Sequence, residues 1–142
     1  MLTMLLVINL SVFAILAFIK VVYYFSFGNE GVGLFQEQIF KWFTLPADLG
    51  TFITRPWTLF THMFVHDTAQ IWHILGNMIW LWAFGSILQD LMGNKKLFPL
   101  YFYGAMGGAF AYMLAYNVIG PLKVDLQYAQ AFGASAGVMG VA

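Results

Sequence analysis

The sequence predicts an all-α membrane protein: a polytopic helix bundle with three full transmembrane helices, the start of a fourth, and a long, partly helical first loop. Of the 142 residues, 61% are hydrophobic and only 8% are charged, whereas soluble domains carry about 25% charged residues. Several apolar runs reach the ~20 residues that a helix needs to cross the hydrocarbon core. Aromatic residues make up 19% of the chain, which suits helices that meet both bilayer interfaces.

Charge and cysteine content exclude several classes of function. The formal net charge is zero, so the composition predicts no nucleic-acid partner, and the lipid bilayer is the expected environment. The chain has no cysteine, which excludes disulfides, thiolate catalysis and Cys-type metal sites.

The first span is predicted over residues 2–25, and the outer loop that follows it over residues 26–68. The span lacks the basic start and the small-residue cleavage site of a signal peptide, which favours a retained helix over a cleaved signal. In the loop, Phe35, Ile39 and Trp42 recur at helical spacing and predict a short amphipathic helix. This helix lies either in the membrane interface or against the protein's own surface.

Two further full spans are predicted over residues 69–92 and 97–119. A fourth is predicted to begin at residue 131 and to be cut short at residue 142, because the chain stops inside an apolar run that follows a turn-prone segment. A membrane helix ending there would leave backbone carbonyl groups without partners in lipid. We therefore expect residues 1–142 to form an incomplete membrane domain.

Small residues mark the third span, and basic residues mark its entry. Gly104, Gly107 and Gly108 lack side chains and predict the close approach of another helix. Lys95 and Lys96 lie in the short connection between the second and third spans, and the positive-inside rule assigns that connection to the cytoplasm. The long first loop is then on the outer side of the membrane.

Three polar residues are predicted to meet near the outer surface. His73 and Asn77 are four residues apart, so they share one face of the second span. Ser135 lies near the start of the fourth span, at a similar depth. Polar groups at membrane depth are costly and suggest a functional site. The alternative is structural, because Ser among small residues is typical of helix packing and Asn and His also bridge helices.

Metal binding is an alternative use of His62, His66 and His73, which are close in sequence. His62 and His66 are four residues apart, and Asp67 is adjacent, so the pair could chelate zinc on one helical face. However, no Glu follows the first histidine as in the H-E-x-x-H pattern of zinc proteases. The sequence therefore predicts no metal and no cofactor.

The order of the motifs resembles that of the rhomboid family of intramembrane serine proteases. The matching pieces are Arg55-Pro56-Trp57, Thr61-His62-Met63-Phe64-Val65-His66, the H-x-x-x-N pair His73 and Asn77, and Gly133-Ala134-Ser135-Ala136, which is similar to G-x-S-G. Span order, the long first loop and the orientation agree as well. The resemblance covers nearly all of the chain, with Ala136 as a mild departure where the pattern most often has Gly.

The resemblance implies a mechanism and a substrate class. Ser135 would be the nucleophile, and its backbone N–H would stabilise the oxyanion together with His73 and Asn77. The small residues Gly133, Ala134 and Ala136 would let the substrate backbone approach. The substrates would be transmembrane proteins, cleaved with a Ser-His dyad.

The base of that dyad in the family is a histidine on the sixth helix, and no histidine follows Ser135 in this chain. A serine without a base is a poor nucleophile at neutral pH. The 142-residue polypeptide made alone is therefore predicted to be inactive.

Two alternatives remain beside the protease hypothesis. One is a catalytically inactive rhomboid-like protein that binds membrane clients, and the other is an unrelated transporter or channel component lined by His73 and Ser135. The expected location is an integral, multi-pass position in the bacterial plasma (inner) membrane. No oligomeric state is assigned.

Overall fold

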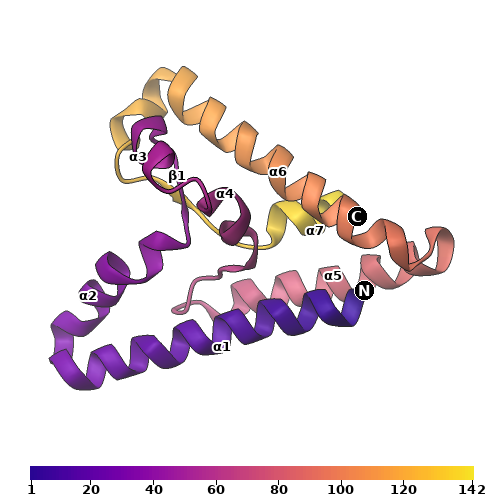
Figure 1. The fold of residues 1–142 in the computed structure, drawn as a ribbon, viewed down its shortest axis with the longest axis horizontal. Coiled ribbons are helices and arrows are strands. Elements are labelled where there is room, and N and C mark those ends of the chain that lie inside the picture. The colour runs from indigo at the N-terminus through magenta and orange to yellow at the C-terminus, as the bar shows by residue number, and fades with distance from the viewer.

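The computed structural model describes all residues from 1 to 142, and it is almost entirely helical (Figure 1). The helices are α1 (Leu2–Phe27), α2 (Gly31–Gln38), α3 (Leu49–Thr54), α4 (Thr58–Thr61), α5 (Ile71–Met92), α6 (Asn94–Val118) and α7 (Ser135–Val141). Short 3-10 turns cover Gly28–Glu30, Phe40–Trp42, His62–Phe64 and Gly120–Asp125. Two strands of two residues each, β1 (Leu45–Pro46) and β2 (Gln130–Ala131), pair antiparallel.

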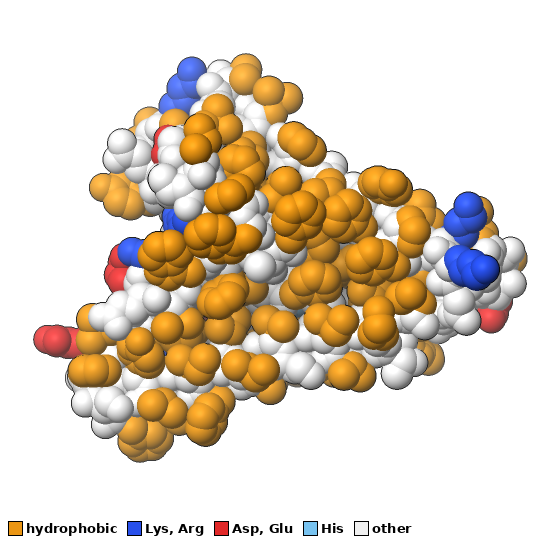
Figure 2. Space-filling model, in the orientation of Figure 1, with side chains coloured by type: hydrophobic (Ala, Val, Ile, Leu, Met, Phe, Trp, Pro, Cys, Tyr) orange, Lys and Arg blue, Asp and Glu red, His pale blue; other side chains and the backbone are white.

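Three helices are long and apolar enough to cross a membrane. They are α1, which opens the helical run Leu2–Trp42, together with α5 and α6. Many large apolar side chains on them are exposed, and Figure 2 shows apolar side chains covering the middle of the molecule while charged ones gather at its ends. Such a surface is stable in lipid and not in water. The predicted all-α, multi-pass membrane fold is confirmed, and the chain is an integral membrane protein.

The main core lies where α1, α5, α6 and α7 meet. Leu5, Leu81, Leu97 and Tyr101 are fully buried there, one or two from each long helix. The Tyr101 hydroxyl donates a hydrogen bond to the Met63 carbonyl at 2.7 Å. This bond ties the middle of the bundle to the end of the outer loop.

The amphipathic segment of the outer loop packs on the protein's own surface. Phe35 of α2 is fully buried and meets Tyr23 of α1 edge to face, with ring centroids 6.2 Å apart. Phe40 packs in the same way on Phe132, which lies just before α7. The aromatic spacing in the sequence therefore reflects contacts within the chain, although Trp42 is 44% exposed.

The predicted start of the fourth span is wrong by four residues. Ala131 belongs to β2, where it pairs with Leu45 of β1, and α7 begins only at Ser135. Between them Gly133 has a φ of 114°, a conformation that favours glycine and interrupts a helix. The strand pairing and this turn delay the helix because both use backbone conformations that a helix lacks.

Glycines let α6 and α7 approach backbone to backbone. A Cβ on Gly104 would lie 2.7 Å from the Gly140 Cα, and one on Gly108 would lie 2.4 Å from the Ala136 Cβ. The expectation of a close helix neighbour is correct for these two positions. It is wrong for Gly107, where a Cβ would meet nothing within 4 Å, because Gly107 is on another face of the helix.

Candidate active site

Ser135 is the first residue of α7 and its side chain is exposed. The chain reaches it through β2 and the tight turn at Gly133. This turn lets the strand end against the outer loop and the helix start against α6. The hydroxyl therefore lies at a junction of the outer loop, α5 and α6.

The two peptide groups before Ser135 are held by the histidine segment of the outer loop. The Gly133 N–H donates to the His62 carbonyl at 2.9 Å, and the Ala134 N–H donates to His66 Nε2 at 3.2 Å. In the sequence these histidines stand out by their spacing, as a metal pair, and by the segment Thr61-His62-Met63-Phe64-Val65-His66 that carries the family resemblance. Their actual contacts are with backbone groups about 70 positions further along the chain, and no local pattern signals such contacts.

Both of these histidines are buried, and burial disfavours their charged forms. For His66, burial and the neighbouring His73 lower the pKa from 6.5 to about 4. Burial likewise lowers the pKa of His62, against the opposing effect of nearby backbone carbonyls. His66 is therefore neutral at physiological pH, as an acceptor nitrogen must be.

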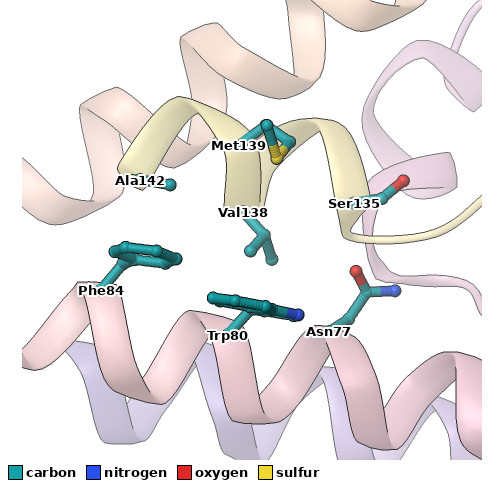
Figure 3. A pocket seen from close by; sticks show the side chains of 7 residues that line it. All are labelled: Asn77, Trp80, Phe84, Ser135, Val138, Met139 and Ala142. Atoms are coloured by element: carbon teal, nitrogen blue, oxygen red, sulfur yellow. The ribbon is translucent and has the colours of Figure 1, made fainter.

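Asn77 extends from α5 toward the start of α7. Its side chain is 7% exposed, and its Nδ2 donates to the His73 carbonyl one turn earlier at 3.1 Å. Figure 3 shows the carboxamide rising from α5 below Ser135. A cavity of about 400 Å³ separates this part of α5 from α7, and it is lined by Asn77, Trp80, Phe84, Ser135, Val138, Met139 and Ala142.

His73 lies across the Gly133 turn from Ser135. A Cβ added to Gly133 would lie 3.1 Å from His73 Nε2 and 3.9 Å from Ser135 Oγ. The imidazole and the hydroxyl therefore border the same small space, which stays open only because residue 133 has no side chain. The structure thus brings His73 and Asn77 of α5 close to Ser135 of α7.

The three small residues around Ser135 occupy different environments. Gly133 and Ala136 line a second cavity of about 180 Å³ on the α6 side of Ser135. Ala134 is fully buried and belongs to the main core. Its methyl group fills the core, and its backbone N–H is the group engaged by His66.

No group of three or more His, Asp or Glu side chains is arranged to hold a metal ion. His62 Nδ1 donates to the Thr58 carbonyl at 3.1 Å, and His66 Nε2 accepts from Ala134. The two histidines considered as a zinc pair are therefore each engaged with a backbone group.

Comparisons with known proteins identify the family of the chain. A family model described as the Rhomboid domain matches residues 54–142, which include both the histidine segment and the Ser135 turn. This chain belongs to the rhomboid family. The match begins just before Arg55-Pro56-Trp57, so it covers every motif that carried the resemblance.

Individual rhomboid relatives are distant. Mitochondrial rhomboid protein 1 of Saccharomyces cerevisiae is 30% identical over 89 residues, which cover 63% of this chain and 25% of that protein. Rhomboid protease GlpG of Salmonella newport is 31% identical over 62 residues, which cover 44% of this chain and 21% of the relative. The chain thus spans a quarter or less of these relatives. No solved structure matches it.

Proposed function

We propose that this rhomboid chain contributes the nucleophile and the oxyanion-binding groups of an intramembrane serine endopeptidase. Ser135 attacks the substrate carbonyl carbon, and the side chains of His73 and Asn77 join the Ser135 N–H around the developing oxyanion. One observation carries the proposal: Ser135 and Asn77 line the same cavity, with His73 across the Gly133 turn.

Asn77 suits the role of a fixed donor. Its Nδ2 is already hydrogen-bonded to the His73 carbonyl, which restricts the carboxamide before any substrate arrives. A donor that needs no reorganisation during the reaction lowers the barrier most. The second N–H of the amide is then available to a substrate oxygen.

The base is proposed to lie outside these 142 residues, on the histidine helix that the rhomboid pattern implies. That histidine would take the Ser135 proton during attack and return it to the leaving amine. Residues 1–142 would then be one part of a larger membrane domain, inactive when made alone.

The proposed substrates are transmembrane proteins whose helices are weak near the outer surface. The cavity between α5 and α7 is apolar apart from Asn77 and Ser135, which suits an unwound apolar segment. The proposed location is the bacterial inner membrane, with the connection between α5 and α6 facing the cytoplasm. Cell fractionation and protease protection of a tag on Lys123 would test the location and the orientation.

A serine-directed fluorophosphonate tests the nucleophile in the full-length protein in lipid vesicles. The wild type should take up the probe and cleave a single-span reporter with Gly and Pro near its outer end, and Ser135→Ala should do neither. Ser86→Ala is the matched control, because the Ser86 hydroxyl only bonds the Trp82 carbonyl within α5. Equal labelling of the wild type and Ser135→Ala would move the nucleophile elsewhere.

The same experiment separates the protease from a non-catalytic client-binding protein. A folded wild type that binds the reporter but neither reacts with the probe nor cleaves would support the client-binding alternative.

A further inference from the structure

We propose that His66 is the positioning residue of the nucleophile: its Nε2 holds the Ala134 peptide and so fixes the orientation of Ser135. The inference rests on the proposed function of Ser135. In this role the His66 side chain affects the reaction indirectly, by holding the backbone that precedes Ser135.

The Gly133 turn makes such a restraint necessary. With a φ of 114°, Gly133 is in a region that only glycine enters readily, and glycine can leave it with little steric resistance. A rotation about the Gly133 backbone would turn the Ala134 peptide and then the Ser135 N–H. Sterics alone therefore do not fix the oxyanion donor, and the bond from Ala134 N–H to His66 supplies the restraint.

The chemical state of His66 agrees with this role. Because Nε2 accepts from Ala134, the ring proton must be on Nδ1. His66 is fully buried, and its Nδ1 has no hydrogen-bond partner. A buried unpaired N–H is costly, so an apolar side chain would fill this site more favourably if packing were its only role. The acceptor at Nε2 is what an apolar residue would lack.

The surroundings of His66 leave it no other polar role. The facing ionisable group is His73 of α5, whose ring meets that of His66 edge to face with centroids 5.5 Å apart. The adjacent Asp67 accepts from the Ala69 N–H instead. His66 therefore lies next to His73, one of the proposed oxyanion donors.

Three variants of the full-length protein in lipid vesicles test this role. His66→Phe keeps a ring and removes the acceptor, and His66→Leu is a second acceptor-free variant in case the first does not fold. His66→Gln supplies an amide oxygen of similar reach that cannot titrate. Asp67→Asn is the matched control in the same segment.

The first measurement is hydrogen exchange at the Ala134 amide, which does not depend on catalysis. Without the acceptor this amide should exchange about tenfold faster, the loss expected for one hydrogen bond. The rate of fluorophosphonate labelling should fall by at least the same factor, with the reporter KM unchanged. His66→Gln should restore both, and Asp67→Asn should change neither.

Three outcomes would overturn the proposal. Unchanged exchange in both acceptor-free variants would show that the bond does not hold the peptide. Faster exchange with unchanged labelling would show that the peptide does not position Ser135. A wild type that takes up no probe, while exchange still follows the acceptor, would refute the proposed function and reduce His66 to a structural residue.

Discussion

The two sides of α7 are built in opposite ways. Toward α6 it packs closely at two glycines: the backbone of Gly104 lies against that of Gly140, and Gly108 lies against the Ala136 methyl group. Toward α5 it faces a cavity of about 400 Å³ that holds Asn77 and Ser135. One helix thus has a closed side, where Gly140 and Ala136 pack against glycines of α6, and an open side, which borders the cavity toward α5 (Figure 3).

This difference shows how a short helix can be anchored on one side and leave the proposed nucleophile exposed on the other. The closed side restricts the position of α7, because the helix cannot move closer to α6 without a clash at Gly104. The open side leaves Ser135 exposed beside the cavity, where the proposed substrate would bind. Substitutions on the closed side should mainly change stability, and those on the open side should mainly change turnover.

The largest effect is expected on the open side, from Asn77→Ala in the full-length protein. Losing one oxyanion donor typically lowers turnover by about 10²–10³-fold, and reporter binding should change little. Steady-state kinetics on the single-span reporter measure both. Asn117→Ala is the control, because Asn117 bonds only the Ala47 and Met113 carbonyls and should cost stability without this loss. An unchanged rate in Asn77→Ala would remove Asn77 from the site.

Acid should lower the free energy of unfolding through His66, which is next to the proposed site. The folded pKa of His66 is about 4, against 6.5 as its ordinary value, so the unfolded chain binds more protons between these values. The contribution of His66 to the free energy of unfolding is therefore highest above pH 6.5. It should fall by roughly 3 kcal/mol as the pH drops from 6.5 to 4. His66→Gln should flatten this slope in denaturation experiments at a series of pH values. Equal slopes in the two proteins would assign the acid sensitivity to other groups.

On the closed side, Gly104→Ala should destabilise the bundle by about 1–3 kcal/mol, the usual cost of overpacking. The new methyl group would meet the Gly140 Cα and the Ala136 carbonyl at 2.7 Å, and these backbone atoms cannot move aside cheaply. Gly107→Ala, three residues later on an open face, should be neutral or gain up to about 1 kcal/mol from helix propensity. Thermal unfolding in detergent compares them, and equal midpoints would contradict the glycine packing.

A smaller effect is expected where the core meets the outer loop. Tyr101→Phe keeps the ring against Gly137 but removes the bond to the Met63 carbonyl, which should cost about 1 kcal/mol. Tyr103→Phe on the same helix is the control, because Tyr103 is 69% exposed. The two unfolding midpoints should differ, and a match would mean that the hydroxyl contributes nothing.

The smallest effect on stability is expected at Met139, on the open side. Its side chain is 74% exposed, so Met139→Ala should change the free energy of unfolding by less than about 0.5 kcal/mol. A large loss of stability would show that the cavity side of α7 is a packed surface after all.

The sequence predicted well what depends on long apolar runs. The spans expected at 2–25, 69–92 and 97–119 correspond to α1, α5 and α6 within three residues at every end, because their hydrophobic lengths are set locally. The close approach at Gly104 and Gly108 was also predictable. The different role of Gly107 was not, since it depends on which face the partner helix covers.

The start of α7 and the contact of His66 could not be predicted, because both depend on segments far apart in the sequence. The late start of α7 follows from the pairing of Leu45 with Ala131, which no local pattern reveals. The role of His66 was missed for a similar reason. Its partner is a backbone N–H 68 positions away, and backbone groups carry no sequence signal.

The pairing of β1 with β2 also orders events during synthesis. The neighbouring side-chain bond from Thr44 to Gln130 joins positions 86 residues apart, and contacts of such separation form late because a long loop must close first. The segment around β1 cannot complete its contacts until the residues just ahead of Ser135 have been synthesised. The proposed site around Ser135 is therefore incomplete until these last residues have been added.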